Sequence, residues 1–144
     1  MDSDDVDALE AAVADTWAWA RALSRAAAHA LEPRLDPTAY PMVALVGSRG
    51  ALRPSEISAA LQLDRSTVSR QIDAAARLGL VERVPDPADA RAVIVRFTPA
   101  AQARMDALRA DRKEQWRAAL ATWEPRDITE LTRLLGMLSK VKLS

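Results

Sequence analysis

The 144-residue sequence contains no cysteine and only one histidine, His29. Without cysteine, disulfide bonds, thiolate nucleophiles, cysteine-ligated zinc and thiol-based sensing of oxidants are all excluded. A single histidine provides one candidate base for Ser-His-Asp chemistry and at most one imidazole ligand for a metal ion. The four glycines form no glycine-rich loop that would hold a phosphate group. The sequence therefore predicts no enzymatic activity, no catalytic residues, no metal site and no cofactor.

Long apolar runs and net charge are also lacking. No apolar stretch reaches the length of about 18 residues that a membrane-spanning helix needs. The N-terminal segment 1–7 is acidic, whereas a secretory signal begins with basic residues. We therefore expect a cytoplasmic protein with no membrane partner. Twenty Lys and Arg residues balance twenty Asp and Glu residues, so any basic surface that attracts nucleic acid must be local.

The spacing of apolar residues predicts the order of the secondary-structure elements. Apolar side chains three or four residues apart indicate amphipathic helices, which we expect over about 4–31, 38–46, 54–61, 65–78, 99–122 and 125–138. We expect Gly47 and Gly50 to close the second of these helices, and Asp64 to cap the fourth. Residues 80–84 and 92–97 are rich in β-branched side chains that alternate with others, which predicts two short strands. The intervening segment 85–91 is predicted to be a hairpin loop longer than a tight turn.

This order predicts a fold that is mainly helical with a small β-hairpin. Two short helices joined by a tight turn and followed at once by a hairpin make a winged helix-turn-helix lobe, which we assign to residues 38–98. The second helix of such a pair enters the major groove of DNA, while the hairpin, or wing, reaches the adjacent minor groove or backbone. The remaining segments, 1–33 and 99–144, are expected to be helical and to form a dimerisation region from both ends of the chain.

The fourth predicted helix presents polar side chains opposite its apolar face. Short hydroxyls and arginines facing away from Val68 and Ile72 suit contacts to base edges and phosphates. A solvated helix face would have a similar pattern, but the hairpin that follows favours DNA contact. The candidate DNA-binding residues on or near this helix are Arg53, Ser55, Arg65, Ser66, Thr67, Ser69, Arg70 and Arg77.

The local charge of this region is only weakly positive. Between Arg49 and Phe97 there are eight arginines and six carboxylates, a net charge of +2. Arginine is suited to bidentate contacts with guanine and phosphate. The small net charge predicts modest non-specific affinity, so specificity must depend on geometry and on the spacing of two recognition helices.

Several motifs resemble the MarR family of bacterial transcription regulators. They are residues 64–70 (DRSTVSR), 78–83 (LGLVER), 86–91 (DPADAR) and the Phe-Thr-Pro at 97–99. The flanking helices match as well, so the resemblance implies a single MarR-like domain over 1–144. It implies that Arg91 enters the minor groove and that Asp89 braces it. A narrow minor groove concentrates negative potential, which attracts an arginine already held in place. One position differs, because many relatives have glycine where this chain has Ala101.

The apolar stripes of the first and last helices predict a homodimer. One recognition helix reads few base pairs, whereas a two-fold dimer doubles the readout on a palindromic operator. The stripes could instead close a monomeric core, but the winged lobe has a core of its own. The resemblance implies the same dimer, for which the candidate interface residues are Leu9, Val13, Trp17, Ile128, Leu131, Leu135 and Leu138.

The resemblance further implies regulation by a small ligand. MarR-like proteins are commonly repressors that aromatic or anionic effectors release from DNA. The candidate effector-binding residues are Trp17, Trp19, Arg21, Arg25, His29 and Tyr40. The function that we expect is therefore a ligand-responsive repressor on double-stranded DNA. The alternative is a winged-helix protein-interaction module without specific DNA binding, which would not need the arginine-rich face and Arg91.

Overall fold

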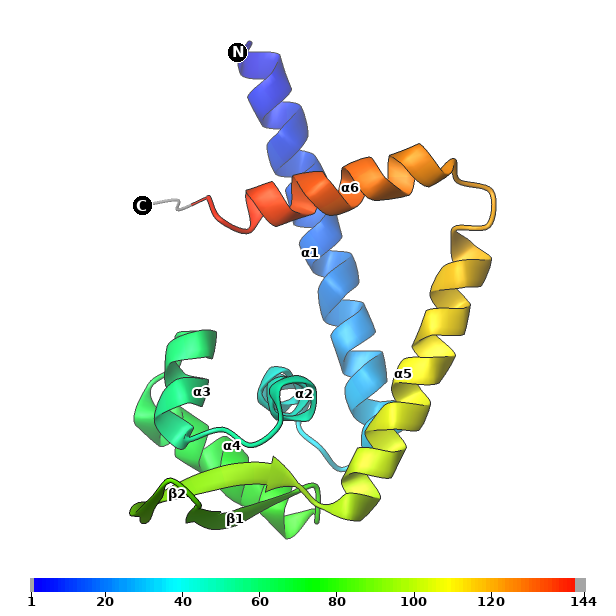
Figure 1. The fold of residues 1–144 in the computed structure, drawn as a ribbon. Helices are drawn as coiled ribbons and strands as arrows, with labels where there is room; N and C mark the ends of the chain where they lie inside the picture. The colour runs from blue at the N-terminus through cyan, green and yellow to red at the C-terminus, as the bar shows by residue number, and fades with distance from the viewer. Residues whose placement is uncertain (1, 142–144) are drawn as a thin grey trace. The chain divides into compact units, whose positions relative to one another are not determined.

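The computed structural model describes residues 2–141. In order along this part of the chain are α1 (Ser3–Leu31), the 3₁₀ turn η1 (Pro37–Ala39), α2 (Tyr40–Arg49), α3 (Pro54–Leu61), α4 (Arg65–Arg77), β1 (Val81–Asp86), β2 (Asp89–Phe97), α5 (Pro99–Ala119) and α6 (Pro125–Leu138) (Figure 1). The predicted fold class, mainly helical with a small antiparallel hairpin, is confirmed. The chain divides within α5 into two compact units, one ending at Leu108 and the other beginning at Arg109. The grouping of both ends into a dimerisation region stays a prediction.

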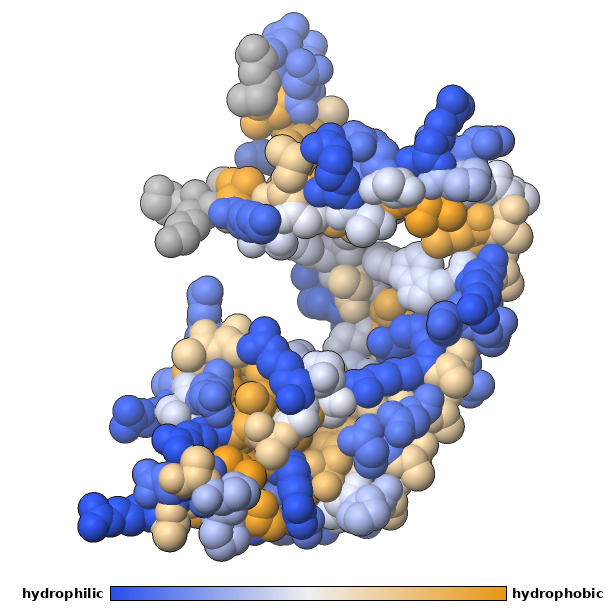
Figure 2. Space-filling view, viewed as in Figure 1, coloured by the Kyte–Doolittle hydropathy of each residue, from blue (hydrophilic) through white to orange (hydrophobic). Residues whose placement is uncertain are grey.

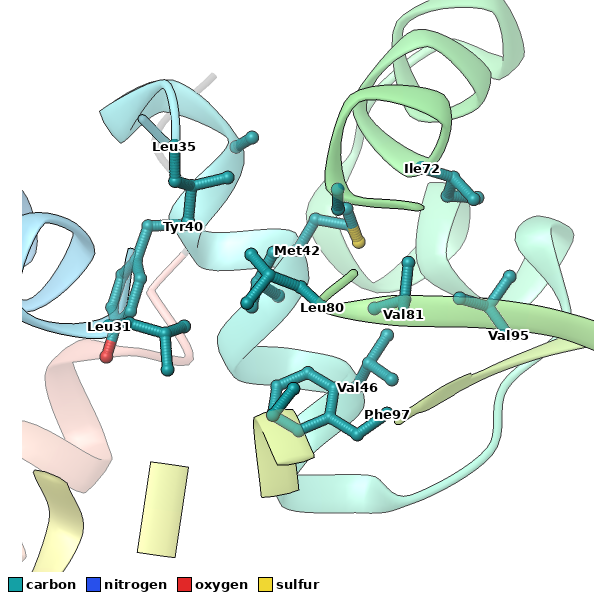
Figure 3. Close-up of a cluster of buried hydrophobic side chains, with 14 of the residues drawn as sticks. Leu31, Leu35, Tyr40, Met42, Val46, Ile72, Leu80, Val81, Val95 and Phe97 are labelled. Carbon is teal, nitrogen blue, oxygen red and sulfur yellow. The ribbon is translucent and has the colours of Figure 1, made fainter. Parts of the chain in front are cut away.

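One hydrophobic core holds the first unit together. Val46 of α2, Ile72 of α4 and Val95 of β2 are at most 1% exposed and face one another in this core (Figure 3). Burying a side chain of this kind stabilises a fold by about 1.5–3 kcal/mol. The C-terminal end of α1 and the first turns of α5 contribute Ala27, Ala28, Leu31, Ala101 and Met105. The core therefore fixes α4 and the hairpin in one lobe.

Local signals at both ends set the length of α4. At its start, the Asp64 side chain accepts a hydrogen bond from the backbone amide of Thr67 at 2.7 Å, as predicted. At its end, Gly79 has φ +71°, and the amide of Leu80 donates to the carbonyl of Ala75 at 3.0 Å. This is a Schellman arrangement, which favours glycine because a Cβ disfavours positive φ. The chain leaves α4 directly into β1.

The hairpin differs from the prediction at its tip. The strands extend to Asp86 and from Asp89, so the loop expected over 85–91 was wrong, and the turn is only Pro87–Ala88. The register runs regularly from Val81↔Phe97 to Pro85↔Val93 and then jumps to Asp86↔Asp89. The extra residues therefore form an irregularity in β2 rather than a loop. The Asp86 carboxylate closes the turn by accepting from the amide of Ala88 at 2.9 Å.

The bounds of α2 also differ from the prediction. Residues 37–39 form η1, and the helix that follows continues past Gly47 to Arg49. Gly50 alone ends it, with φ +83°. The prediction that both glycines close the helix was therefore wrong for Gly47. A glycine within a helix costs only about 1 kcal/mol relative to alanine, so burial of the neighbouring Val46 can keep the helix intact.

The second unit contains the end of α5 and all of α6. No residue of α6 is buried, although its sequence carries a strong apolar stripe. Figure 2 shows hydrophobic side chains at the surface of α6. In the first unit, α1 is likewise buried only near its C-terminal end, at Ala27, Ala28 and Leu31. Both helices thus have apolar faces that the described chain leaves uncovered.

Candidate nucleic-acid interface

The outer face of α4 is built from polar side chains opposite three core residues. Val68, Ile72 and Ala75 are completely buried, and the helical period of 3.6 residues turns the intervening side chains outward. The outward residues include a half-buried Thr67 and four exposed side chains, namely Arg65, Ser66, Ser69 and Arg70. These predicted recognition residues of α4 thus lie outside the core, within the first two turns of the helix.

The first turn of α4 is organised around the Asp64 carboxylate. Besides the Thr67 amide, it accepts from the hydroxyl of Ser66 at 2.7 Å and from that of Thr67 at 3.0 Å. These hydrogen bonds, the one from Ser66 foremost, lower the pKa of Asp64 to about 2. Arg70 Nη2 in turn donates to Thr67 Oγ1 at 3.3 Å. The polar groups at this end of α4 are therefore held in place before any partner binds.

Arg91 lies in the irregular part of β2 and is exposed. Asp89 Oδ1 accepts a hydrogen bond from the backbone amide of Arg91 at 3.0 Å. Asp89 thus contacts the backbone of Arg91 and not its guanidinium. Within residues 2–141 no ion pair joins the side chains of Asp89 and Arg91. Hydrophilic side chains project from the tip of the hairpin at the lower left of Figure 2. The Arg91 side chain is therefore exposed near the tip of the hairpin, and its backbone amide is hydrogen-bonded to Asp89.

In the structure Arg53 makes contacts with two carboxylate side chains that the sequence did not predict, those of Asp86 and Glu56. Its Nε donates to Asp86 Oδ2 at 2.7 Å, and its backbone amide donates to Glu56 Oε2 at 2.7 Å. The pKa of Asp86 is lowered by the Ala88 amide and then by Arg53. Because Arg53 and Asp86 are 33 positions apart, no local pattern in the sequence indicates that they form a pair. The two remaining candidates, Ser55 near the start of α3 and Arg77 at the end of α4, are exposed.

The predicted effector-binding residues are only partly brought together. Trp17, Arg21 and Arg25 follow one another at intervals of four residues on α1, so their side chains form one row, which His29 continues. Trp19 is rotated by about 200° from Trp17 around the helix axis. The Tyr40 side chain lies in the core of the first unit and is 6% exposed (Figure 3).

The predicted dimer residues are mostly exposed in the single chain. Val13 and Ile128 are half-buried, whereas the other five are between 40% and 59% exposed: Leu9, Trp17, Leu131, Leu135 and Leu138. Further exposed apolar residues on or beside the same helices are Trp19, Leu134, Met137 and Val141. Exposed apolar residues in such number on a helix are typical of an interaction surface, and this holds for α1 and α6 each taken by itself.

Residues 2–141 contain neither a cluster of metal-ligating side chains nor a helix that could span a membrane. No group of three or more His, Asp or Glu side chains is arranged to hold a metal ion in this range. None of its helices has the length and apolar character needed to cross a membrane.

These features define a winged helix-turn-helix protein: a capped recognition helix, a preceding short helix and a hairpin, packed on one core. The MarR family model matches residues 35–92. The chain is 27% identical over 110 residues to the HTH-type transcriptional regulator PecS of Dickeya dadantii, an alignment that covers 74% of this chain and 66% of PecS. It is 30% identical over 65 residues to the multiple antibiotic resistance protein MarR of Salmonella typhimurium, which covers 45% of each protein. The matched regions thus span about half to two thirds of these relatives.

The fold is also similar to that of a solved MarR family structure over nearly the whole chain. A MarR family protein from Bacillus stearothermophilus has a TM-score of 0.79 and 21% identity, covering 97% of this chain and 96% of that protein. In sequence the chain is therefore similar to the MarR family of transcriptional regulators over its winged helix-turn-helix lobe, and it has the fold of a solved MarR family structure.

Proposed function

We propose that this chain binds double-stranded DNA sequence-specifically and regulates transcription, with α4 in the major groove and the hairpin in the adjacent minor groove. The observation that carries the proposal is the preorganised polar face of α4, which lies in the same compact unit as the exposed Arg91. Arginines and hydroxyls at this spacing match the donor and acceptor pattern of base edges and phosphates. This function requires the cytoplasmic location that the sequence predicts.

The functional form is a homodimer. The exposed leucines of α6 and the exposed apolar residues of α1 each offer apolar area that a second copy of the chain could cover. Closed two-fold symmetry would place two copies of α4 on the two halves of a palindromic operator. Replacing Leu131 and Leu135 by aspartate should therefore convert dimers to monomers in sedimentation experiments. A wild-type chain that sediments as a monomer at micromolar concentration would contradict this part of the proposal.

The proposed outcome of binding is repression, relieved by a small anionic aromatic effector. The row formed by Trp17, Arg21 and Arg25 on α1 supports this chemistry, because an indole can stack on an aromatic ring while guanidiniums pair with a carboxylate. A suitable probe is salicylate, titrated while tryptophan fluorescence and operator affinity are followed together. Quenching with a loss of affinity supports the proposal, and the response should be absent in Arg21→Ala/Arg25→Ala. Quenching with unchanged operator affinity would contradict it.

The decisive experiment is fluorescence anisotropy on the duplex upstream of the chain's own gene, with a scrambled duplex as the control, across a salt series. We expect tighter binding to the native duplex, saturating at two chains per site. Equal, weak and steeply salt-dependent binding to both duplexes would contradict specific recognition at that site. It would then favour the alternative function, docking of a protein partner by the winged helix.

A further inference from the structure

The tip of the wing is joined to the start of α3 by an ion pair between Arg53 and Asp86. Nε and Nη2 of Arg53 lie 2.7 Å and 2.6 Å from the same Asp86 oxygen, Oδ2. The Asp86 side chain is 10% exposed, against 40% for that of Arg53. Because the carboxylate is largely shielded from water, this pair is screened less by salt than an ordinary surface pair.

The tip has little other support. The ladder between β1 and β2 is regular only as far as Pro85↔Val93, and residues 90–92 have no partner in the register. Arg91 lies in this unpaired stretch. The other oxygen of Asp86 accepts from the Ala88 amide and closes the turn. Asp86 is therefore the residue through which the tip is attached to the rest of the lobe.

We propose that Arg53 is a positioning residue, which presents Arg91 to DNA by fixing Asp86 and the turn, and does not itself contact DNA. The inference rests on the proposed DNA-binding function. Because the Arg53 amide also donates to Glu56, one residue links the first helix of the helix-turn-helix pair with the wing. The distance between α4 and the wing tip then depends on this ion pair as well as on the core.

The charge of the variants separates positioning from direct contact. Asp86→Asn removes a negative charge near the DNA and keeps an oxygen that can accept from Ala88, so a purely coulombic effect would raise operator affinity. Positioning predicts instead that Asp86→Asn and Arg53→Ala both lower affinity, on the order of fivefold, as part of the Arg91 contact is lost. Arg49→Ala is the matched control for losing one positive charge, because Arg49 is exposed and outside the proposed interface. Higher affinity in Asp86→Asn would overturn the proposal.

A double-mutant cycle provides the second test. If Arg53 acts through Arg91, Arg53→Ala should have little further effect on operator affinity in an Arg91→Ala background. Additive losses would place Arg53 on the DNA itself and would overturn the positioning role.

A third test requires no DNA. Proteolysis is faster where a segment opens locally. Arg53→Ala should therefore increase the initial rate of trypsin cleavage at the 91–92 bond several-fold, at an unchanged far-ultraviolet circular dichroism spectrum. Equal cleavage rates in Arg53→Ala and the wild type would overturn the inference. Faster cleavage of Arg53→Ala supports the role of Arg53 in holding the wing tip. If the wild type then binds no duplex specifically, only the proposed DNA-binding function fails.

Discussion

Arg83 of β1 and Asp73 of α4 form an ion pair, with 2.7 Å between Nη2 and Oδ1. Both side chains are more than one third exposed, so the pair contributes little to stability, about 0–1 kcal/mol. Its consequence is geometric, because it joins the recognition helix to the first strand of the wing. Together with the pair between Arg53 and Asp86, it connects β1 both to α4 and to the residue that precedes α3. We expect the lobe to bind DNA as one preformed surface.

Replacing Arg91 by alanine should lower operator affinity by about tenfold or more, in line with the 1–3 kcal/mol typical of one specific contact. The loss should be greater than that of Arg49→Ala, which removes the same charge from an exposed site outside the interface. Anisotropy titrations of both variants at one salt concentration make the comparison. Equal affinities of Arg91→Ala and the wild type would rule out a role for the wing arginine.

Replacing Ile72 by alanine should destabilise the lobe by about 2–5 kcal/mol, because a buried side chain is lost and a cavity remains. Ile72 is completely buried on the inner face of α4, so operator affinity should fall only as far as the lobe unfolds. Urea denaturation measures the free energy of unfolding. Ile72→Val serves as the graded control, with an expected cost of about 0.5–1.5 kcal/mol. A cost below that of the valine variant would show that the core tolerates the cavity.

Replacing Gly79 by alanine should cost about 1 kcal/mol for purely conformational reasons. A Cβ at this position meets no atom within 4 Å, but the residue has φ +71°, which L-residues rarely adopt. Gly136→Ala is the control, and its expected effect on stability is the opposite of that of Gly79→Ala. Gly136 is within α6, has no positive φ and also has open space around it. Alanine there should raise helix stability by about 0.5–1 kcal/mol. Thermal unfolding of both variants decides the matter, and a stabilising Gly79→Ala would contradict the explanation.

Glu32, which follows α1, should make the first unit sensitive to acid. Its side chain accepts hydrogen bonds from Arg34 Nε at 2.8 Å and from Arg104 Nη1 of α5 at 3.5 Å. The bonds from Arg34 are the main cause that lowers the pKa of Glu32 to about 2 from 4.5. A carboxyl whose pKa is lower in the folded state stabilises it fully above the unfolded pKa. This contribution should disappear as the pH falls from about 4.5 to about 2.

Glu32→Gln isolates this contribution. The variant should be less stable than the wild type near neutral pH and should lose less stability on acidification, so that the two curves converge at low pH. Urea unfolding at a series of pH values gives both curves. Parallel curves for the two proteins between about pH 4.5 and about pH 2 would show that other carboxylates account for the acid sensitivity.

Much of the lobe was predictable because its signals are local. The Asp64 cap and Gly79 lie within a few residues of the ends of α4, and the apolar period of α4 identifies the face that carries Arg65 and Arg70. The hairpin tip was not predictable in the same way. Two prolines and four small or acidic residues in the segment 85–91 predict a loop. In the structure the Asp86 side chain closes a two-residue turn, and the extra residues belong to β2.

The order of the elements, the polar outer face of α4 and the resemblance to the MarR family follow from the amino-acid sequence alone, because each depends on residues close together in the chain. The long-range ion pairs follow only from the tertiary structure. Arg53 meets Asp86 across 33 positions, and Arg104 meets Glu32 across 72. Such pairs form because a shared hydrophobic core brings their helices and strands together, and no local pattern encodes that approach. The apolar periodicity of a segment indicates whether it forms a helix or a strand, whereas tertiary packing determines which distant charged residues come into contact.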